Sequence, residues 1–342
     1  MLVLRFKPYT LQLKYPFGIA GNTRTTTPIV LTELEYDGVI GYGEASLPPY
    51  LGETQESVQL FLSQLSLNHF SPFEPKEILI YVNNLLSGNT AAKASVDIAL
   101  HDLFGKLNNT PCYKMFGANP SLMPKTSITI GIDTEEVIAK KVNETIGFDI
   151  LKVKLGSVDD KKIINAIRKV TNKVLSVDVN QGWKDKHFAL EMIEWLNEQN
   201  VLFVEQPMPK EMLNEISWLT ERSPLPVIAD ESIQRLSDLD NIKNAYNGIN
   251  IKLMKCSGMY EASKLIDKAR EYNLKILIGC MNESSCANMA AAQLAPLADW
   301  VDLDGPFLIN NNPFKDPEIK EGKIVLSELP GIGLELNTSS SL

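Results

Sequence analysis

The stretch DILKVKLG, residues 149–156, places two lysines in a run that otherwise resembles a buried strand. Successive side chains of a strand point to opposite faces, so Lys152 and Lys154 share one face. A solvated edge strand would explain the pair, because lysines at a sheet edge protect against aggregation. The other explanation is two buried functional ammonium groups, and the rest of the chain has to decide between them.

The composition is typical of a globular protein, with 342 residues, 44% hydrophobic content and a formal net charge of −9. No run approaches the roughly 18 apolar residues of a membrane helix, and the first residues lack the apolar segment of a signal peptide. We therefore expect a cytoplasmic protein without a membrane partner. Scattered lysines in an acidic chain also argue against a nucleic-acid partner, which needs a basic face.

The cysteines and histidines lack the spacing of metal ligands. No two cysteines form a C-x-x-C pair, which favours reduced structural thiols over disulfides or zinc. For the histidines we expect packing or surface roles. The residues concerned are Cys112, Cys256, Cys280, Cys286, His69, His101 and His187.

The pattern of the chain changes near residue 123. Before it, residues 28–45 (PIVLTELEYDGVIGYGEA) alternate like strands around an Asp37-Gly38 hairpin signal, and residues 90–109 have helical spacing. From Lys125 onward, short apolar strands alternate with amphipathic helices. We expect an α+β domain, then a barrel, then a segment that returns to the first domain. The predicted ranges are 1–123, 124–310 and 311–342.

Eight strands are predicted in the second part, spaced by roughly 20–30 residues, which is the size of one unit of a β/α barrel. The turn-rich segment after the last strand lacks a full eighth helix. The predicted strands are residues 126–130, 149–155, 173–179, 201–206, 226–230, 248–253, 275–279 and 300–304.

Charged residues stand at the carboxyl ends of most of these strands, where barrel enzymes place their chemistry. Isolated charges cost several kcal/mol to bury, so these charges must compensate one another. They form a candidate site made of Lys152, Lys154, Asp178, Glu205, Asp230, Lys252, Asp302 and Asp304.

Asp178, Glu205 and Asp230 end three adjacent predicted strands. Any one of them could be an ordinary capping or salt-bridging residue, but three converging carboxylates are the oxygen ligands that Mg²⁺ prefers. Lys154 and Lys252 flank them. Near Mg²⁺ and other ammonium groups a lysine is driven toward its neutral form and can act as a base near pH 7.

These motifs resemble the enolase superfamily. LKVKLG is similar to its K-x-K motif, and VDVNQGW, VEQP and ADES are similar to the three metal-ligand motifs of the muconate-lactonizing subgroup. INIKLMKCSG resembles the second-base motif, whereas GYGEA and ALHDLFGKLNNTPCYKMFG resemble capping-domain signatures. The resemblance covers nearly the whole chain. It implies a (β/α)7β modified TIM barrel with an α+β capping domain, one Mg²⁺ per subunit, abstraction of a proton α to a carboxylate, and a homo-oligomer.

The resemblance also implies roles for the lysines. Lys154 and Lys252 become bases on opposite faces of the substrate carbon, while Lys152 lowers the pKa of Lys154 and helps to neutralise the substrate carboxylate. Mg²⁺ and Lys152 together stabilise the enediolate. Deprotonation on one face and reprotonation on the other amounts to racemisation or epimerisation.

Several members of the subgroup share this lysine pair, and the last strand distinguishes them. VDLDGP resembles the D-x-D motif of dipeptide epimerases, where Asp302 and Asp304 would share a face and hold the terminal ammonium of the substrate. The resemblance thus favours an isomerase that inverts the C-terminal residue of an Ala-X dipeptide. An N-succinylamino-acid racemase or o-succinylbenzoate synthase is the alternative.

The preferred residue X is less sharply defined. Residues 17–28 (FGIAGNTRTTTP) correspond to the capping loop of the subgroup, where Arg24 could pair with an acidic side chain such as glutamate. The Ala-Glu epimerases place their arginine closer to the PF of this loop, so a packing role for Arg24 stays equally open. We predict a small, hydrophobic or polar X, with Ala-Glu as a close competitor.

The remaining candidates support the site. The loop after the seventh strand is expected to contact the dipeptide, although its small residues could simply begin the next helix; it contributes Cys280, Met281 and Asn282. Hydrogen bonds that orient the carboxylates or lysines are expected from Asn180, Gln206 and Glu231.

Overall fold

Alternating apolar residues in the first part of the chain form a three-stranded antiparallel sheet. In the computed structural model, which describes residues 1–19 and 22–337, the strands are β1 (Val3–Ile19), β2 (Asn22–Tyr36) and β3 (Val39–Ser46), in the order β1-β2-β3. Asp37 and Gly38 join β2 to β3 with φ angles of 51° and 79°. Two positive φ angles define the tight hairpin turn that the sequence predicted.

Most of residues 17–28, described as a loop from the sequence, belongs to a paired β-hairpin. β1 continues to Ile19 and β2 begins at Asn22, and the register pairs Phe17 with Arg24. Strand-favouring residues, including the threonines at 25–27, explain why pairing extends this far. Residues 20–21 lie outside the described residues. Arg24 is therefore held on a paired strand.

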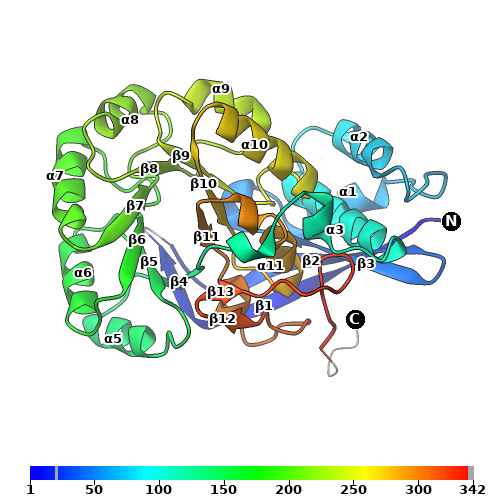
Figure 1. The fold of residues 1–342 in the computed structure, drawn as a ribbon, viewed down its shortest axis with the longest axis horizontal. Coiled ribbons are helices and arrows are strands. Elements are labelled where there is room, and N and C mark those ends of the chain that lie inside the picture. Colours follow the sequence, from blue (N-terminus) through cyan, green and yellow to red (C-terminus); the bar gives the residue numbers. More distant parts are fainter. Residues whose placement is uncertain (20–21, 338–342) are drawn as a thin grey trace.

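Helices cover one side of this sheet (Figure 1). The helices α1 (Gln55–Ser63) and α3 (Thr90–Leu107) lie against the sheet, while α2 (Pro75–Leu85) and α4 (Cys112–Met115) lie against α3. The short turns of this part are η1 (Pro49–Leu51) and η2 (Pro120–Leu122). The small residues of α3 let it approach β3 closely. A Cβ atom on Gly43 would lie 1.9 Å from the Ser95 oxygen, and one on Gly41 would lie 2.2 Å from the Ala99 oxygen. The glycines of GYGEA are thus required by packing.

The second part is an eight-stranded parallel barrel with helices around it (Figure 1). Its strands are β4 (Ser127–Ile130), β5 (Ile150–Lys154), β6 (Val174–Asp178), β7 (Val201–Glu205), β8 (Val227–Ala229), β9 (Gly248–Ile251), β10 (Lys275–Gly279) and β11 (Trp300–Asp302). They pair in chain order, and a parallel bridge between Thr126 and Val301 brings the two ends of the sheet together.

A helix lies between each pair of consecutive barrel strands. These helices are α5 (Glu135–Asn143), α6 (Asp160–Arg168), α7 (Lys186–Asn197), α8 (Leu213–Thr220), α9 (Leu239–Ile242), α10 (Met259–Glu271) and α11 (Ser285–Ala292), with the short turns η3 (Leu236–Asp238) and η4 (Ala295–Leu297). The short turn η5 (Gly305–Leu308) follows β11 where an eighth helix would begin. The (β/α)7β barrel with a capping domain is therefore confirmed.

The edge-strand explanation for the two lysines is wrong. β5 lies between β4 and β6 in the barrel, and Lys152 and Lys154 are only 2% and 8% exposed. Leu151 and Val153, on the opposite face of the same strand, are fully buried. A strand of a barrel is covered on both faces, so the lysines point into the barrel.

The last described residues lie against the capping part. Ile309 bridges to Leu13, Gly331 bridges to Pro111, and the ring of Phe314 packs edge-on against Tyr42. This segment includes the short strands β12 (Ile319–Lys320) and β13 (Lys323–Ile324). These contacts support the predicted return to the first domain, and the boundaries at residues 123 and 310 stay a prediction.

The remaining sequence predictions concern single residues. None of the four cysteines is bonded to another, and Cys280 is the one that is partly exposed. Their reduced state stays a prediction. His101 packs in the interior with its Nδ1 3.2 Å from a carboxylate oxygen of Asp97. Within residues 1–19 and 22–337, no helix combines the length and apolar character needed to cross a membrane.

Close packing of β3 on α3 generates a stability prediction. Gly43→Ala is expected to lower the free energy of unfolding by about 1–3 kcal/mol, because the added methyl group overpacks the contact with the Ser95 backbone. Urea unfolding measures this loss. Gly38→Ala is the control, since nothing lies within 4 Å of a Cβ atom there and the cost, about 1 kcal/mol, is backbone strain. Equal losses in the two variants would show that packing does not require Gly43.

Candidate active site

A cavity of about 270 Å³ opens at the carboxyl ends of the barrel strands, beneath the capping domain. Both parts of the chain contribute to its walls. The lining residues are Arg24, Pro48, Pro49, Tyr50, Thr129, Lys152, Lys154, Asn180, Gln181, Asp230, Glu231, Lys252, Cys280, Met281, Asn282, Asp302 and Asp304.

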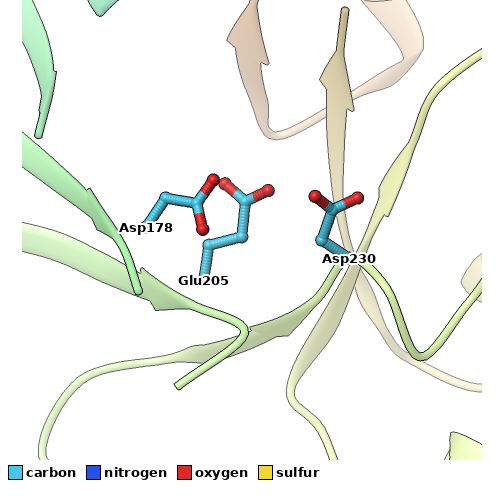
Figure 2. A group of neighbouring side chains, drawn as sticks. All are labelled: Asp178, Glu205 and Asp230. Atoms are coloured by element: carbon cyan, nitrogen blue, oxygen red, sulfur yellow. The ribbon is translucent and has the colours of Figure 1, made fainter. Parts of the chain in front are cut away.

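Three buried carboxylates gather beside this cavity (Figure 2). Asp178 and Glu205 are the last residues of β6 and β7, and Asp230 directly follows β8. The parallel register places Asp178 beside Glu205, so each strand delivers its carboxylate to the same rim. Each residue offers one oxygen, and these three oxygens lie within 4.8 Å of one another. The sequence prediction that these side chains converge is confirmed.

The group fits a divalent cation. Oε2 of Glu205 is buried, and its partner is the ion pair with the Lys152 ammonium at 2.8 Å; the same ammonium lies 3.3 Å from Asp178 Oδ2. Burial raises the pKa of Glu205 to about 7, and the charge of Asp178 acts in the same direction. A cation of higher charge at this position would therefore relieve carboxylate repulsion, as Mg²⁺ does with oxygen ligands.

Each lysine is paired with a different set of carboxylates. Lys154 Nζ lies 2.7 Å from Asp178, and Lys252 Nζ lies 2.6 Å from Asp230. Lys152 Nζ lies 2.7 Å from Asp302, in addition to its contacts with Glu205 and Asp178. The three ammonium groups therefore compensate the carboxylates, as buried charges must.

The carboxylates also affect the protonation of the lysines. Burial by itself would lower the pKa of Lys152, but Asp302, Glu205 and Asp178 outweigh burial and hold that pKa well above its usual value. Burial likewise favours a lower pKa for Lys252, but the charge of Asp230 and other nearby groups outweighs burial and holds that pKa well above its usual value.

Asp302 and Asp304 are not related by strand alternation as the sequence predicted. β11 ends at Asp302, and Asp304 directly precedes η5. Asp302 accepts hydrogen bonds from Ser127 Oγ and Lys152 Nζ, both at 2.7 Å. Asp304 accepts one from the Thr129 backbone N–H at 2.6 Å. Both carboxylates nevertheless line the cavity, and burial together with Asp302 raises the pKa of Asp304 to about 6.

The other predicted site residues lie close to this cluster. Arg24, Cys280, Met281 and Asn282 line the cavity, with Arg24 half-buried on β2. The Cys280 thiol lies 3.7 Å from an Asp304 oxygen. The individual roles given to these residues stay predictions.

The residues predicted to orient the site make the expected kind of contact. The Gln206 side-chain oxygen accepts from the backbone N–H groups of Asp230 and Ser232. The Asn180 backbone N–H donates to Asp178, and its side chain donates to Glu231 at 3.3 Å. Burial, followed by the charge of Asp230, raises the pKa of Glu231 to about 7.

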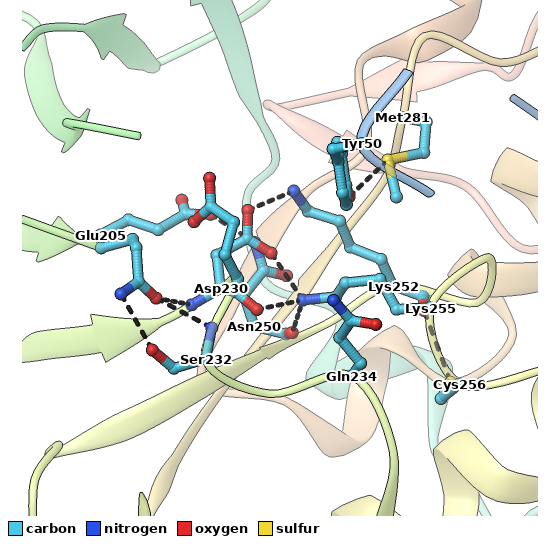
Figure 3. A network of polar contacts seen from close by, with 12 residues as sticks. Tyr50, Glu205, Asp230, Ser232, Gln234, Asn250, Lys252, Lys255, Cys256 and Met281 are labelled. Atoms are coloured by element: carbon cyan, nitrogen blue, oxygen red, sulfur yellow. Dashed lines mark hydrogen bonds and ion pairs between the residues drawn. The ribbon is translucent and has the colours of Figure 1, made fainter. Parts of the chain in front are cut away.

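Sequence reasoning missed two residues that hold the carboxylates (Figure 3). Lys255 is almost fully buried and donates to the Asp230 side chain at 2.5 Å, the Asp230 backbone oxygen at 2.8 Å and the Asn250 backbone oxygen at 2.9 Å. Asn250 donates from its side chain to Glu205 at 2.7 Å. A polar residue inside the apolar strand β9, and a second lysine in INIKLMKCSG, were the available signals.

Comparison with known proteins identifies the family. The family model described as mandelate racemase / muconate lactonizing enzyme, N-terminal domain, matches residues 3–117, and the enolase C-terminal domain-like model matches residues 136–340. The chain belongs to the enolase superfamily. This confirms the resemblance that was inferred from the motifs.

Similar enolase-superfamily proteins include a curated relative and two solved structures. A protein of Bacteroides thetaiotaomicron named L-Ala-D/L-Glu epimerase is 54% identical over 333 residues, which cover 97% of this chain and 87% of the relative. The L-Ala-D/L-Glu epimerase of Bacillus subtilis, in a substrate-liganded complex, has a TM-score of 0.91 at 27% identity and covers 97% and 98% of the two chains.

The second structure is a dipeptide epimerase from Enterococcus faecalis, complexed with Mg and the dipeptide L-Leu-L-Tyr. It has a TM-score of 0.88 at 30% identity and covers 97% of this chain and 98% of its own. All three proteins are named epimerases. The prediction of an isomerase of the racemase and epimerase class is confirmed at that level.

The carboxylate group generates a metal prediction. Mg²⁺ at a hundredfold excess over its Kd is expected to stabilise the wild-type protein by about 2.7 kcal/mol, seen as a rise in Tm. Asp178→Asn is expected to abolish most of that rise because a ligand is lost. Thermal unfolding with and without Mg²⁺ measures both.

Asp160→Asn is the matched control for this measurement. Asp160 is a buried carboxylate that accepts from Gly156, Ser157 and Trp183, so its loss lowers Tm but should leave the rise with Mg²⁺ intact. A full Mg²⁺ response in Asp178→Asn would contradict the assignment of the metal site.

Proposed function

We propose that this protein is a Mg²⁺-dependent dipeptide epimerase that inverts the α-carbon of the C-terminal residue of an Ala-X dipeptide. One observation carries the proposal: the three carboxylates, the lysines at the ends of β5 and β9, and the aspartates at and just beyond the end of β11 all lie at or beside one cavity. The names of the relatives described above support the same reaction.

Asp178, Glu205 and Asp230 would hold Mg²⁺, which when bound supplies a positive charge that stabilises the negative charge developing on the substrate carboxylate. Lys152 adds a second positive charge beside the same carboxylates. Its ammonium is paired with Glu205 at 2.8 Å and with Asp302 at 2.7 Å, so we assign Lys152 the role of a fixed positive charge and not of a base.

Lys154 and Lys252 are the two bases. Lys154 ends β5 and Lys252 follows β9, with β6, β7 and β8 between them around the barrel. The two Nζ atoms therefore approach the cavity from different sides, and each is tied to its own carboxylate, Asp178 or Asp230. One lysine removes the α-proton and the other returns a proton on the opposite face, which inverts the carbon.

Asp304 is the better candidate for the terminal ammonium of the dipeptide. Asp302 is already compensated by the Lys152 ammonium at 2.7 Å, whereas Asp304 accepts from two uncharged donors, the Thr129 backbone N–H and the Cys280 thiol. A substrate ammonium near Asp304 would place the other end of the dipeptide, its carboxylate, toward the metal ligands. The separation between Asp304 and the metal ligands would then limit the length of the substrate.

The position of Arg24 supports glutamate as X. The sequence left a packing role open because Arg24 is distant from Phe17 along the chain, but the hairpin register places the two residues opposite each other. Arg24 also lines the cavity, and burial lowers its pKa. A guanidinium in a buried pocket is well suited to a second carboxylate. We therefore include glutamate in the proposed function, alongside the small, hydrophobic or polar X expected earlier.

Incorporation of solvent deuterium tests the function. The protein with Mg²⁺ in D₂O is offered a library of Ala-X dipeptides beside N-succinyl amino acids, and mass gain at the α-carbon is recorded. Gain confined to dipeptides is expected, and the rates across the library rank X, with the highest rate for Ala-Glu if Arg24 pairs with the side chain. Gain confined to N-succinyl amino acids would overturn the proposal in favour of the racemase alternative.

The role of Asp304 gives a separate prediction. Asp304→Asn is expected to raise KM for dipeptides by about tenfold to a hundredfold, since hydrogen bonds to charged groups contribute roughly 1.5–3 kcal/mol. The Kd for Mg²⁺ should change little, because Asp304 is not one of the three converging carboxylates. Steady-state kinetics and metal titration measure the two quantities. An unchanged KM would remove Asp304 from the substrate site.

A further inference from the structure

Glu44 has no role in the site described above, yet it is a fully buried carboxylate on β3 that reaches from the capping domain to the barrel. Its Oε1 accepts from the Ser284 backbone N–H at 3.0 Å, and its Oε2 accepts from the Ser284 hydroxyl. Ser284 caps the first turn of α11, where its Oγ accepts from the Cys286 N–H at 3.1 Å. The Glu44 carboxylate thus extends the cap of a barrel helix.

Two further contacts join the capping domain to the residues that directly precede Ser284. Ser46 stands two residues beyond Glu44 and on the same face of β3. Its Oγ donates to the Asn282 backbone oxygen at 3.0 Å. Tyr50 in η1 donates from its hydroxyl to the Met281 sulfur at 3.3 Å (Figure 3). Residues 44–50 of the capping domain therefore contact residues 281–284 at successive points.

The loop of residues 280–284 also forms part of the wall of the cavity. The loop joins β10 to α11, and Cys280, Met281 and Asn282 line the cavity together with Lys252 and Asp304. Within the loop, the Met281 N–H donates to the Glu283 side chain at 3.2 Å. A shift of Ser284 would carry these lining residues with it, because they are only two to four positions away along the chain.

We propose that Glu44 is a positioning residue for the substrate: its bond to Ser284 fixes the loop of residues 280–284 and thereby the wall of the dipeptide pocket. Glu44 does not touch the reacting atoms. The inference deepens the proposed function and rests on it for its kinetic test. It also gives a reason for the glutamate in GYGEA that packing of the neighbouring glycines does not supply.

A matched control separates positioning from ordinary stabilisation. Asp102 is also a fully buried carboxylate, and it accepts from the backbone N–H groups of Tyr42 on β3 and of Ile332, both at 2.9 Å, and from the Lys106 ammonium at 2.6 Å. Asp102 thus holds β3, as Glu44 does, but it joins β3 to the C-terminal segment and not to the loop of residues 280–284. Losing either carboxylate should lower stability, whereas only Glu44 is expected to affect the pocket.

The experiment compares Glu44→Gln with Asp102→Asn in the Mg²⁺-loaded enzyme at pH 8. Both variants are expected to lower Tm. Glu44→Gln alone should raise KM for the dipeptide about tenfold with kcat within threefold of wild type, and should leave the Kd for Mg²⁺ unchanged. Hydrogen–deuterium exchange should increase at the backbone amides of residues 281–288 in Glu44→Gln and not in Asp102→Asn.

Ser46→Ala and Ser284→Ala serve if Glu44→Gln does not fold, and both keep the carboxylate. Ser46→Ala removes the contact to the Asn282 backbone oxygen, whereas Ser284→Ala removes the hydroxyl that binds Glu44 and also caps α11. Each is expected to raise KM less than Glu44→Gln does and to increase exchange in the same amides. Equal KM values in the Glu44 and Asp102 variants, or unchanged exchange at residues 281–288, would overturn the proposal. Failure of the proposed function appears differently, as absence of dipeptide deuteration by the wild-type enzyme, and the exchange comparison then decides alone on Glu44.

Discussion

Mutual compensation of buried charges at the carboxyl end of the barrel is the constraint on which the rest of the structure depends. Asp178, Glu205 and Asp230 cannot be buried together without cations, and Lys152, Lys154 and Lys252 supply them at 2.6 to 3.3 Å. Desolvating an unpaired charge costs several kcal/mol. The strands must therefore end in register, so that each charge meets its partner, and a misaligned strand would leave a charge uncompensated.

The same compensation makes the site suitable for chemistry. The carboxylates that stabilise the ammonium groups are also the ligands suited to Mg²⁺, so metal binding and lysine protonation are linked. A metal held by Asp178 and Asp230 would share the negative charge that these two carboxylates now offer to Lys154 and Lys252, the bases of the proposed reaction. Lys152 remains beside Asp302, which is outside the metal group, and keeps its charge.

The capping domain is joined to the barrel by carboxylates as well. Asp97 on α3 accepts from the Met259 N–H at the start of α10, and Glu44 on β3 accepts from Ser284 before α11. The two helices follow β9 and β10, the strands that carry Lys252 and the cavity loop. Side chains at helix N-termini satisfy N–H groups that the helix itself leaves without partners. The capping domain is thereby attached to the barrel at the helices that follow Lys252 and the loop of residues 280–284.

The sequence by itself determined the fold class and the positions of the carboxylates and lysines, because each lies at the end of an apolar strand and barrel strands end at one rim. Only the tertiary structure decided which groups pair, that Asp304 lies beyond β11, and that Arg24 belongs to a paired hairpin. The contacts of Lys255, Asn250 and Glu44 were likewise visible only in the fold. Their partners are distant in the chain or lie on another strand, and no local pattern encodes a hydrogen bond between elements brought together by folding.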